Sequence, residues 1–190
     1  MLRVAFARYQ IGSSFEWNRI VALSGQALGL LLAFPREAML PLSQSFRGEN
    51  AMDLGIKGKR ALVCASSKGL GLGCAEALAE AGVDLVMNAR GAADLDSAAE
   101  RLRQDYGVEV TTVVADIATE EGQSAVLDAA GQIDILVNNA GGPPPGMWQD
   151  WDREDFIKAL DANMLAPIAM IKALVPLMMD RGWGRVVNIT

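Results

Sequence analysis

Residues 60–73 read RALVCASSKGLGLG, and this stretch decides the fold. Its first half, Arg60–Ala65, is a short apolar run that predicts a buried β-strand. A glycine-rich turn follows and leads into Gly71–Ala81, where apolar residues recur at helical spacing. We expect the conformational freedom and close packing of this turn to come from its glycines, Gly69, Gly71 and Gly73.

A glycine-rich turn between a strand and a helix is suited to binding a phosphate. Its backbone amides can approach the ligand closely, and the helix N-terminus directs free N–H groups at the negative charge. Taken alone, the same pattern also fits a tight turn that binds no ligand, so its context must decide.

The alternation of strand and helix continues to the last residues. Further strands are predicted at Val83–Asn88, Glu109–Ala115, Ile133–Asn138 and Gly184–Thr190, and helices at Ala92–Tyr106, at Thr119–Ala130 with Thr119 as the N-cap, and at Asp152–Arg181 with a break near Asn163 to Pro167. Such alternation predicts an α/β fold, a doubly wound parallel sheet of the Rossmann type with helices on both faces. We expect the sheet to be incomplete, with five strands present.

Residues 1–51 differ from the remainder. They contain no Lys and no Asp and carry a charge of +2, whereas residues 52–190 carry −8. Their apolar run, Val21–Phe34, falls short of the roughly 20 residues that a membrane-spanning helix needs. A signal peptide is one interpretation, but no small-residue cleavage site follows the run. We favour an N-terminal extension outside the fold, with Met52 as the true start.

Composition excludes several classes of function. The net charge of −6 argues against a nucleic-acid partner, which requires a basic face. The chain has no histidine, which excludes His-based triads and His metal sites, and we expect no metal. Two cysteines, Cys64 and Cys74, fit a reduced cytoplasmic protein without a membrane partner.

The end of the second predicted strand indicates which dinucleotide would bind. Folds that bind NAD place an Asp or Glu there, on the ribose hydroxyl. Here the position holds Arg90, and Lys68 in the glycine turn adds a second positive charge. A guanidinium suits the 2′-phosphate, so NADP(H) is predicted over NAD(H). The alternative is that Arg90 is a solvated surface residue.

These features resemble the short-chain dehydrogenase/reductase family. Residues Cys64–Gly71 are similar to its Thr-Gly-x-x-x-Gly-x-Gly pattern, with Cys64 in place of Thr and Ala65 in place of the first Gly. The alanine costs little if its φ is negative. Asp116-Ile117 resembles the family's adenine-contacting pair, and Asn138-Asn139-Ala140-Gly141 its Asn-Asn-Ala-Gly motif.

The resemblance implies a set of site residues. Those implied for the cofactor NADP are Ser66, Ser67, Lys68, Gly69, Leu70, Gly71, Arg90, Asp116, Ile117, Asn139, Ala140 and Gly141. Asn163 resembles the family's catalytic Asn, which holds a water in a proton relay; the alternative is a surface Asn or a local cap. The family's catalytic Ser, Tyr and Lys would follow Thr190, and neither Tyr9 nor Tyr106 matches that Tyr.

The resemblance therefore implies NADP(H)-dependent reduction of a carbonyl or oxidation of an alcohol on a small molecule. Overall similarity is greatest to the group called 3-oxoacyl-[acyl-carrier-protein] reductases, which suggests a 3-oxoacyl thioester. We expect the 190-residue chain to be an inactive fragment of a homodimer or homotetramer. The alternatives are a non-catalytic NADP-binding or regulatory module and, more weakly, a methyltransferase-like domain, which would lack the Asn-Asn-Ala-Gly motif.

Overall fold

A computed structural model describes residues 53–142 and 146–189 of the chain. The predictions for residues 1–51 and for the start at Met52 lie outside these described residues.

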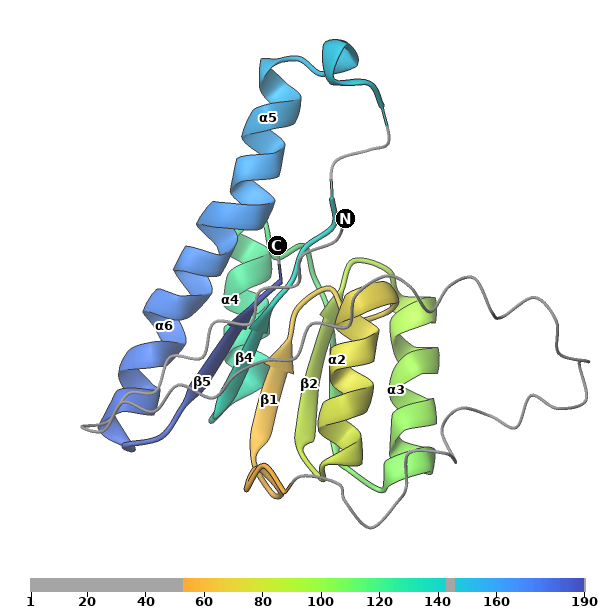
Figure 1. The fold of residues 1–190 in the computed structure, drawn as a ribbon, viewed down its shortest axis with the longest axis vertical. Coiled ribbons are helices and arrows are strands. Elements are labelled where there is room, and N and C mark those ends of the chain that lie inside the picture. Colours follow the sequence, from red (N-terminus) through yellow and green to blue (C-terminus); the bar gives the residue numbers. More distant parts are fainter. Residues whose placement is uncertain (1–52, 143–145, 190) are drawn as a thin grey trace, which may run out of the picture. The chain divides into compact units, whose positions relative to one another are not determined.

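Five parallel strands form one sheet (Figure 1). They are β1 (Arg60–Val63), β2 (Asp84–Ala89), β3 (Val110–Val114), β4 (Ile135–Asn138) and β5 (Arg185–Asn188). The order across the sheet is β3-β2-β1-β4-β5, and every neighbouring pair is parallel. The chain builds outward from β1 in one direction and then returns to build in the other, which is the predicted doubly wound arrangement.

Helices cover both faces of this sheet: α2 (Gly69–Glu80) and α3 (Ala92–Tyr106) share one core with it, and α4 (Glu120–Ala130) and α6 (Ala166–Asp180) share the other. Helix α5 (Arg153–Leu160) has no buried residue and extends beyond the strands (Figure 1). Along β1, Ala61 and Val63 pack into the core with α2 and α3, whereas Leu62 packs into the core with α4 and α6. The strands are apolar without alternation because each successive side chain enters one of two cores.

The long C-terminal helical region is continuous. Between α5 and α6, residues Asp161–Leu165 form a π-helical segment, so the predicted break is a local widening of the helix. Pro167 gives the physical reason: it has no N–H to donate to the carbonyl of Asn163, as an α-helix would require. Asp152 starts the rod by accepting hydrogen bonds from the N–H groups of Glu154 and Asp155.

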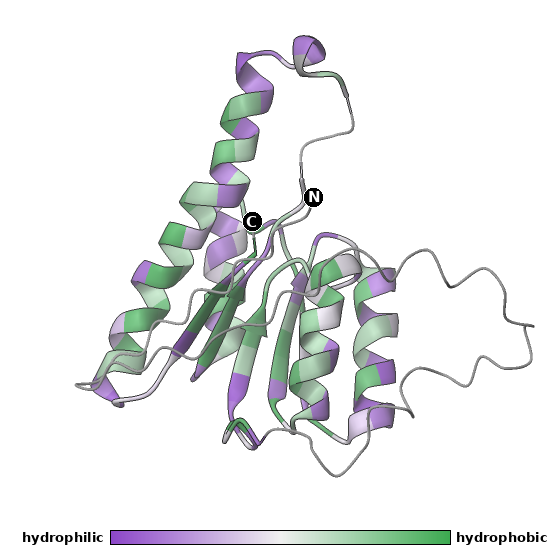
Figure 2. Cartoon of the chain, in the orientation of Figure 1, coloured by the Kyte–Doolittle hydropathy of each residue, from purple (hydrophilic) through white to green (hydrophobic). Residues whose placement is uncertain are grey.

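The same rod, Arg153–Asp180, is long and apolar enough to cross a membrane by length and composition alone. Figure 2 shows apolar residues along much of it. One stripe of α6, formed by Ala166, Met170, Leu174 and Met178, is buried in the core beside the sheet. A helix that covers a sheet passes the same test, so the rod is weak evidence for a membrane span.

Candidate cofactor-binding site

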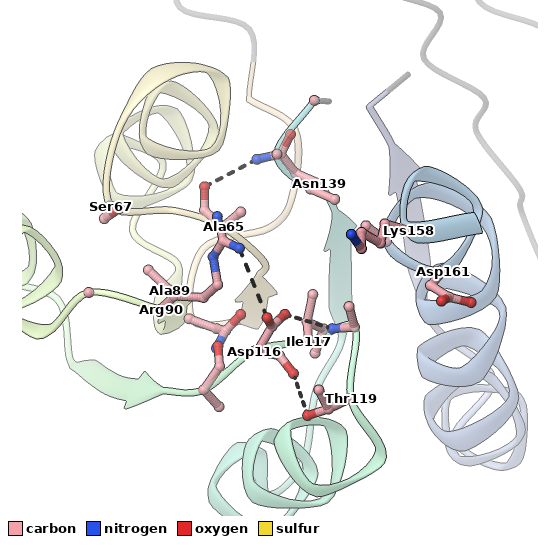
Figure 3. Close-up of a pocket in the computed structure, with 18 of the residues that line it drawn as sticks. Ala65, Ser67, Ala89, Arg90, Asp116, Ile117, Thr119, Asn139, Lys158 and Asp161 are labelled. Atoms are coloured by element: carbon pink, nitrogen blue, oxygen red, sulfur yellow. Dashed lines mark hydrogen bonds and ion pairs between the residues drawn. The ribbon is translucent and has the colours of Figure 1, made fainter. Parts of the chain in front are cut away.

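A cavity of about 830 Å³ lies where the turns after the first four strands meet one side of α5. This is the carboxyl edge of the sheet, at the point where the strand order reverses, and it is where doubly wound folds bind ligands. Nine of the predicted cofactor residues line it: Ser67, Lys68, Leu70, Arg90, Asp116, Ile117, Asn139, Ala140 and Gly141. Figure 3 shows several of them around the cavity.

The glycine turn differs from the prediction in where the helix begins and in what Gly73 does. Helix α2 begins at Gly69, whose φ of +61° suits glycine, so Gly71 lies in the first helical turn. A Cβ on Gly71 would lie 2.2 Å from the carbonyl oxygen of Ala65, so this glycine permits close packing. A Cβ on Gly73 would meet nothing within 4 Å, so the packing role expected of this glycine is wrong.

Ala65 does not meet the condition under which an alanine here would cost little. Its φ is +47°, in the left-handed region, and not negative. A Cβ in that region is disfavoured because it approaches the following carbonyl oxygen. The position at which the family pattern has glycine therefore carries backbone strain in this chain.

We expect Ala65→Gly to raise the free energy of unfolding by about 0.5–1 kcal/mol, since the relief of strain outweighs the greater freedom of glycine in the unfolded chain. Urea denaturation of the two proteins would measure it. A lower free energy of unfolding for Ala65→Gly would contradict the claim that the backbone is strained at this position.

Asn139 holds the turn from across the sheet. Its Nδ2 donates to the carbonyl oxygen of Ala65 at 3.1 Å (Figure 3) and to that of Cys64 at 3.3 Å. Asn139 thus ties the loop after β4 to the turn after β1.

Cys64 lies in this same turn. Burial raises the pKa of its thiol to about 12, and a hydrogen bond involving Asn139 acts in the opposite direction, so the thiol is neutral at physiological pH.

Asn88, at the carboxyl end of β2, was not predicted as a site residue. It is 1% exposed and lines the cavity. Its Nδ2 donates to the carbonyl oxygens of Val113 and Ala115, both at 3.0 Å. The backbone carbonyl oxygen of Asn88 accepts hydrogen bonds from the N–H of Ser66 at 2.9 Å and from the Ser66 hydroxyl at 3.3 Å. The sequence signal that could have identified Asn88 is a polar residue at the end of an otherwise apolar strand.

Four predicted site residues do not line the cavity: Ser66, Gly69, Gly71 and Asn163. Ser66 is fully buried and supports the turn through Asn88. Asn163 lies in the π-helical segment, where its Nδ2 donates to the carbonyl oxygen of Ala159 at 3.0 Å.

Arg90 and Asp116 lie together at one wall of the cavity (Figure 3). Nη1 of Arg90 is 4.0 Å from Oδ2 of Asp116, and their side chains are 78% and 44% exposed. A long, solvated ion pair of this kind contributes little energy. The guanidinium can therefore leave it for a stronger anion at small cost.

The α5 wall was missed by sequence reasoning. It consists of Asp155, Lys158 and Ala159 of α5 and of Asp161 and Ala162 in the π-helical segment that follows. Figure 3 shows Lys158 and Asp161 on this helical rod, across the cavity from Arg90. No local pattern marks these residues, because only the packing of the helical rod against the sheet brings them to the strand ends.

The sheet, the glycine turn and this cavity define a dinucleotide-binding protein of the Rossmann type. The comparison with known sequences is more specific: the family described as short chain dehydrogenase matches residues 59–190. The chain belongs to the short-chain dehydrogenase family.

Individual relatives agree with this assignment. The gluconate 5-dehydrogenase of Gluconobacter oxydans is 35% identical over 138 residues, which cover 70% of this chain and 54% of that protein. L-sorbose reductase from Gluconobacter frateurii, complexed with NADPH and L-sorbose, is 38% identical with a TM-score of 0.66, covering 70% of this chain and 52% of that one.

A third comparison involves the other dinucleotide. A 7α-hydroxysteroid dehydrogenase complexed with NADH is 29% identical with a TM-score of 0.62, covering 68% of this chain and 51% of that one. The chain spans about half the length of the relatives it matches.

Proposed function

We propose that the cavity binds NADP(H) and that the whole protein is an oxidoreductase acting on a small carbonyl compound or alcohol. Similar folds are complexed with NADPH in one relative and NADH in another, so the fold alone does not choose the cofactor. The observation that carries the choice is Arg90, which lines the cavity at the carboxyl end of β2, where a carboxylate would favour NAD.

The residues of the cavity fit an anionic dinucleotide. Lys68 is the N-cap of α2 and its side chain accepts no hydrogen bond, so no side chain caps the N–H groups of the first turn. These groups and the positive end of the helix suit a pyrophosphate. Two positively charged side chains also line the cavity: Lys68 in the glycine turn and Arg90 at the end of β2.

Two further loops fit the remaining parts of the cofactor. Asp116 and Ile117 line the wall beside Arg90, where an adenine would lie against them. The loop Asn139–Gly141 lines the cavity after β4, on the side proposed for the nicotinamide ribose. When bound, the cofactor would supply or accept a hydride.

Asn163 is proposed to act in proton transfer. Its side-chain amide is held by Ala159, and Pro167 cannot donate to its backbone carbonyl as the next turn of an α-helix would. That carbonyl is a candidate acceptor for a relay water. The 3-oxoacyl thioester substrate, the cytoplasmic location and the dimeric or tetrameric assembly stay predictions.

Cofactor choice is tested with Arg90→Ala. We expect NADPH to bind about 10- to 100-fold more weakly, because a charged hydrogen-bonding partner of the 2′-phosphate is lost. NADH affinity should stay within about twofold, since that dinucleotide lacks the phosphate. Fluorescence titration of both dinucleotides gives the two dissociation constants.

Arg153→Ala is the matched control, because it removes the same charge from an exposed residue outside the cavity. It should leave both affinities unchanged. A wild-type protein that binds neither dinucleotide, or that prefers NADH, would overturn the proposed function.

A further inference from the structure

Asp94 lines two spaces. Besides the main cavity, a shallow surface depression of about 400 Å³ lies beside α2 and α3. Its lining shares three residues with the main cavity: Ser67, Lys68 and Asp94. An acidic side chain four residues after Arg90 thus lines the same two spaces as the glycine-turn lysine.

The acidic side chains that line the main cavity differ in their hydrogen-bond and ion-pair partners. Asp116 pairs with Arg90. Asp155 accepts a hydrogen bond from the N–H of Asp152 and so helps to begin α5. Asp161 lies on the α5 wall, across from Arg90 (Figure 3). Asp94, in contrast, lies in the first turn of α3, four residues after Arg90, and its exposed side chain has no hydrogen-bond or ion-pair partner within residues 53–142 and 146–189.

Helix stabilisation alone would also place an acid here. Asp94 is the acidic residue in the first turn of α3, where a carboxylate interacts favourably with the helix dipole. That role does not require the side chain to line either space. A measurement of cofactor selectivity separates the two roles, because a helix-stabilising charge would not distinguish between dinucleotides.

We propose that Asp94 limits selectivity for the phosphorylated dinucleotide. Its negative charge opposes the 2′-phosphate that Lys68 and Arg90 attract, whereas the neutral ribose hydroxyl of NADH is not repelled. The preference for NADPH is then smaller than the two cations alone would produce. This inference rests on the proposed binding of NADP(H) in the main cavity.

The test is Asp94→Asn, assayed by titration with NADPH and with NADH. The dissociation constant of NADPH should fall about three- to tenfold at low salt, and the gain should shrink as ionic strength rises. NADH affinity should change less than about twofold, because the removed charge faces no phosphate on that ribose. Asp94→Glu, which keeps the charge, should retain the wild-type ratio of affinities.

Asp96→Asn is the matched control. Asp96 lies on the same helix and lines neither space, and its Oδ1 accepts from the Thr112 hydroxyl at 3.0 Å. An unchanged NADPH-to-NADH ratio in Asp94→Asn, or an equal shift in Asp96→Asn, would overturn the role of Asp94. If the wild type bound NADH but not NADPH, the proposed function would fail first, and the inference would fail with it.

Discussion

Gly71→Ala is expected to lower the free energy of unfolding by about 3 kcal/mol and to abolish detectable NADPH binding. The added Cβ would lie 2.2 Å from the carbonyl oxygen of Ala65 and 2.7 Å from Nδ2 of Asn139. Those two atoms are joined by a hydrogen bond of 3.1 Å, so neither can retreat without weakening it. The substitution must therefore displace the turn from α2.

Gly73→Ala is the internal control for this experiment. Gly73 lies two residues after Gly71 in α2, and a Cβ at this position would meet nothing within 4 Å. Replacing a glycine inside a helix should raise the free energy of unfolding by about 0.5–1 kcal/mol and leave binding intact. Urea denaturation and NADPH titration of both variants give the comparison. Equal stability of the two would show that the turn accommodates the methyl group.

The second large effect is expected for Asn88→Ala, which should lower the free energy of unfolding by about 2–3 kcal/mol. The change removes the amide that donates to the carbonyls of Val113 and Ala115 at the end of β3. Because Ala115 immediately precedes Asp116, we expect weaker NADPH binding as well. Thermal unfolding and cofactor titration would measure both consequences.

Two companion variants identify the cause. Asn88→Asp keeps the shape of the side chain but cannot donate to two carbonyls when ionised, so it should be destabilised like the alanine variant. Ser66→Ala removes a hydroxyl that donates at 3.3 Å and should cost no more than about 1 kcal/mol. A stable Asn88→Asp protein would attribute the effect to lost volume instead of lost hydrogen bonds.

Much of the fold could be predicted because its signals are local. Apolar runs placed all five strands to within two residues at either end, and Ala92–Tyr106 matches α3 at both ends. The N-cap at Thr119 is confirmed, since its Oγ1 accepts from the N–H of Gly122 at 3.0 Å. Each of these features depends on residues within a turn or two of one another.

The candidate site was predictable only where its residues end strands. Parallel strands present their carboxyl ends at one edge, so the turns after β1, β2, β3 and β4 had to meet there. Nine predicted residues do line the cavity for that reason. The α5 wall could not be predicted, because its distance from the strand ends depends on packing between segments far apart in the chain.

Two details depended on the backbone in three dimensions. The φ of Ala65 is positive because the chain must turn from β1 into α2 beneath Asn139, whatever residue occupies the position. The helical rod widens at Asp161–Leu165 instead of breaking. The order of residues along the chain was sufficient to specify the strand–helix alternation and the cation after β2, since both are properties of single segments. The strain in the turn, the amide contacts across the sheet and the second wall of the cavity arise only when separate segments pack, since each requires atoms that the sequence places far apart.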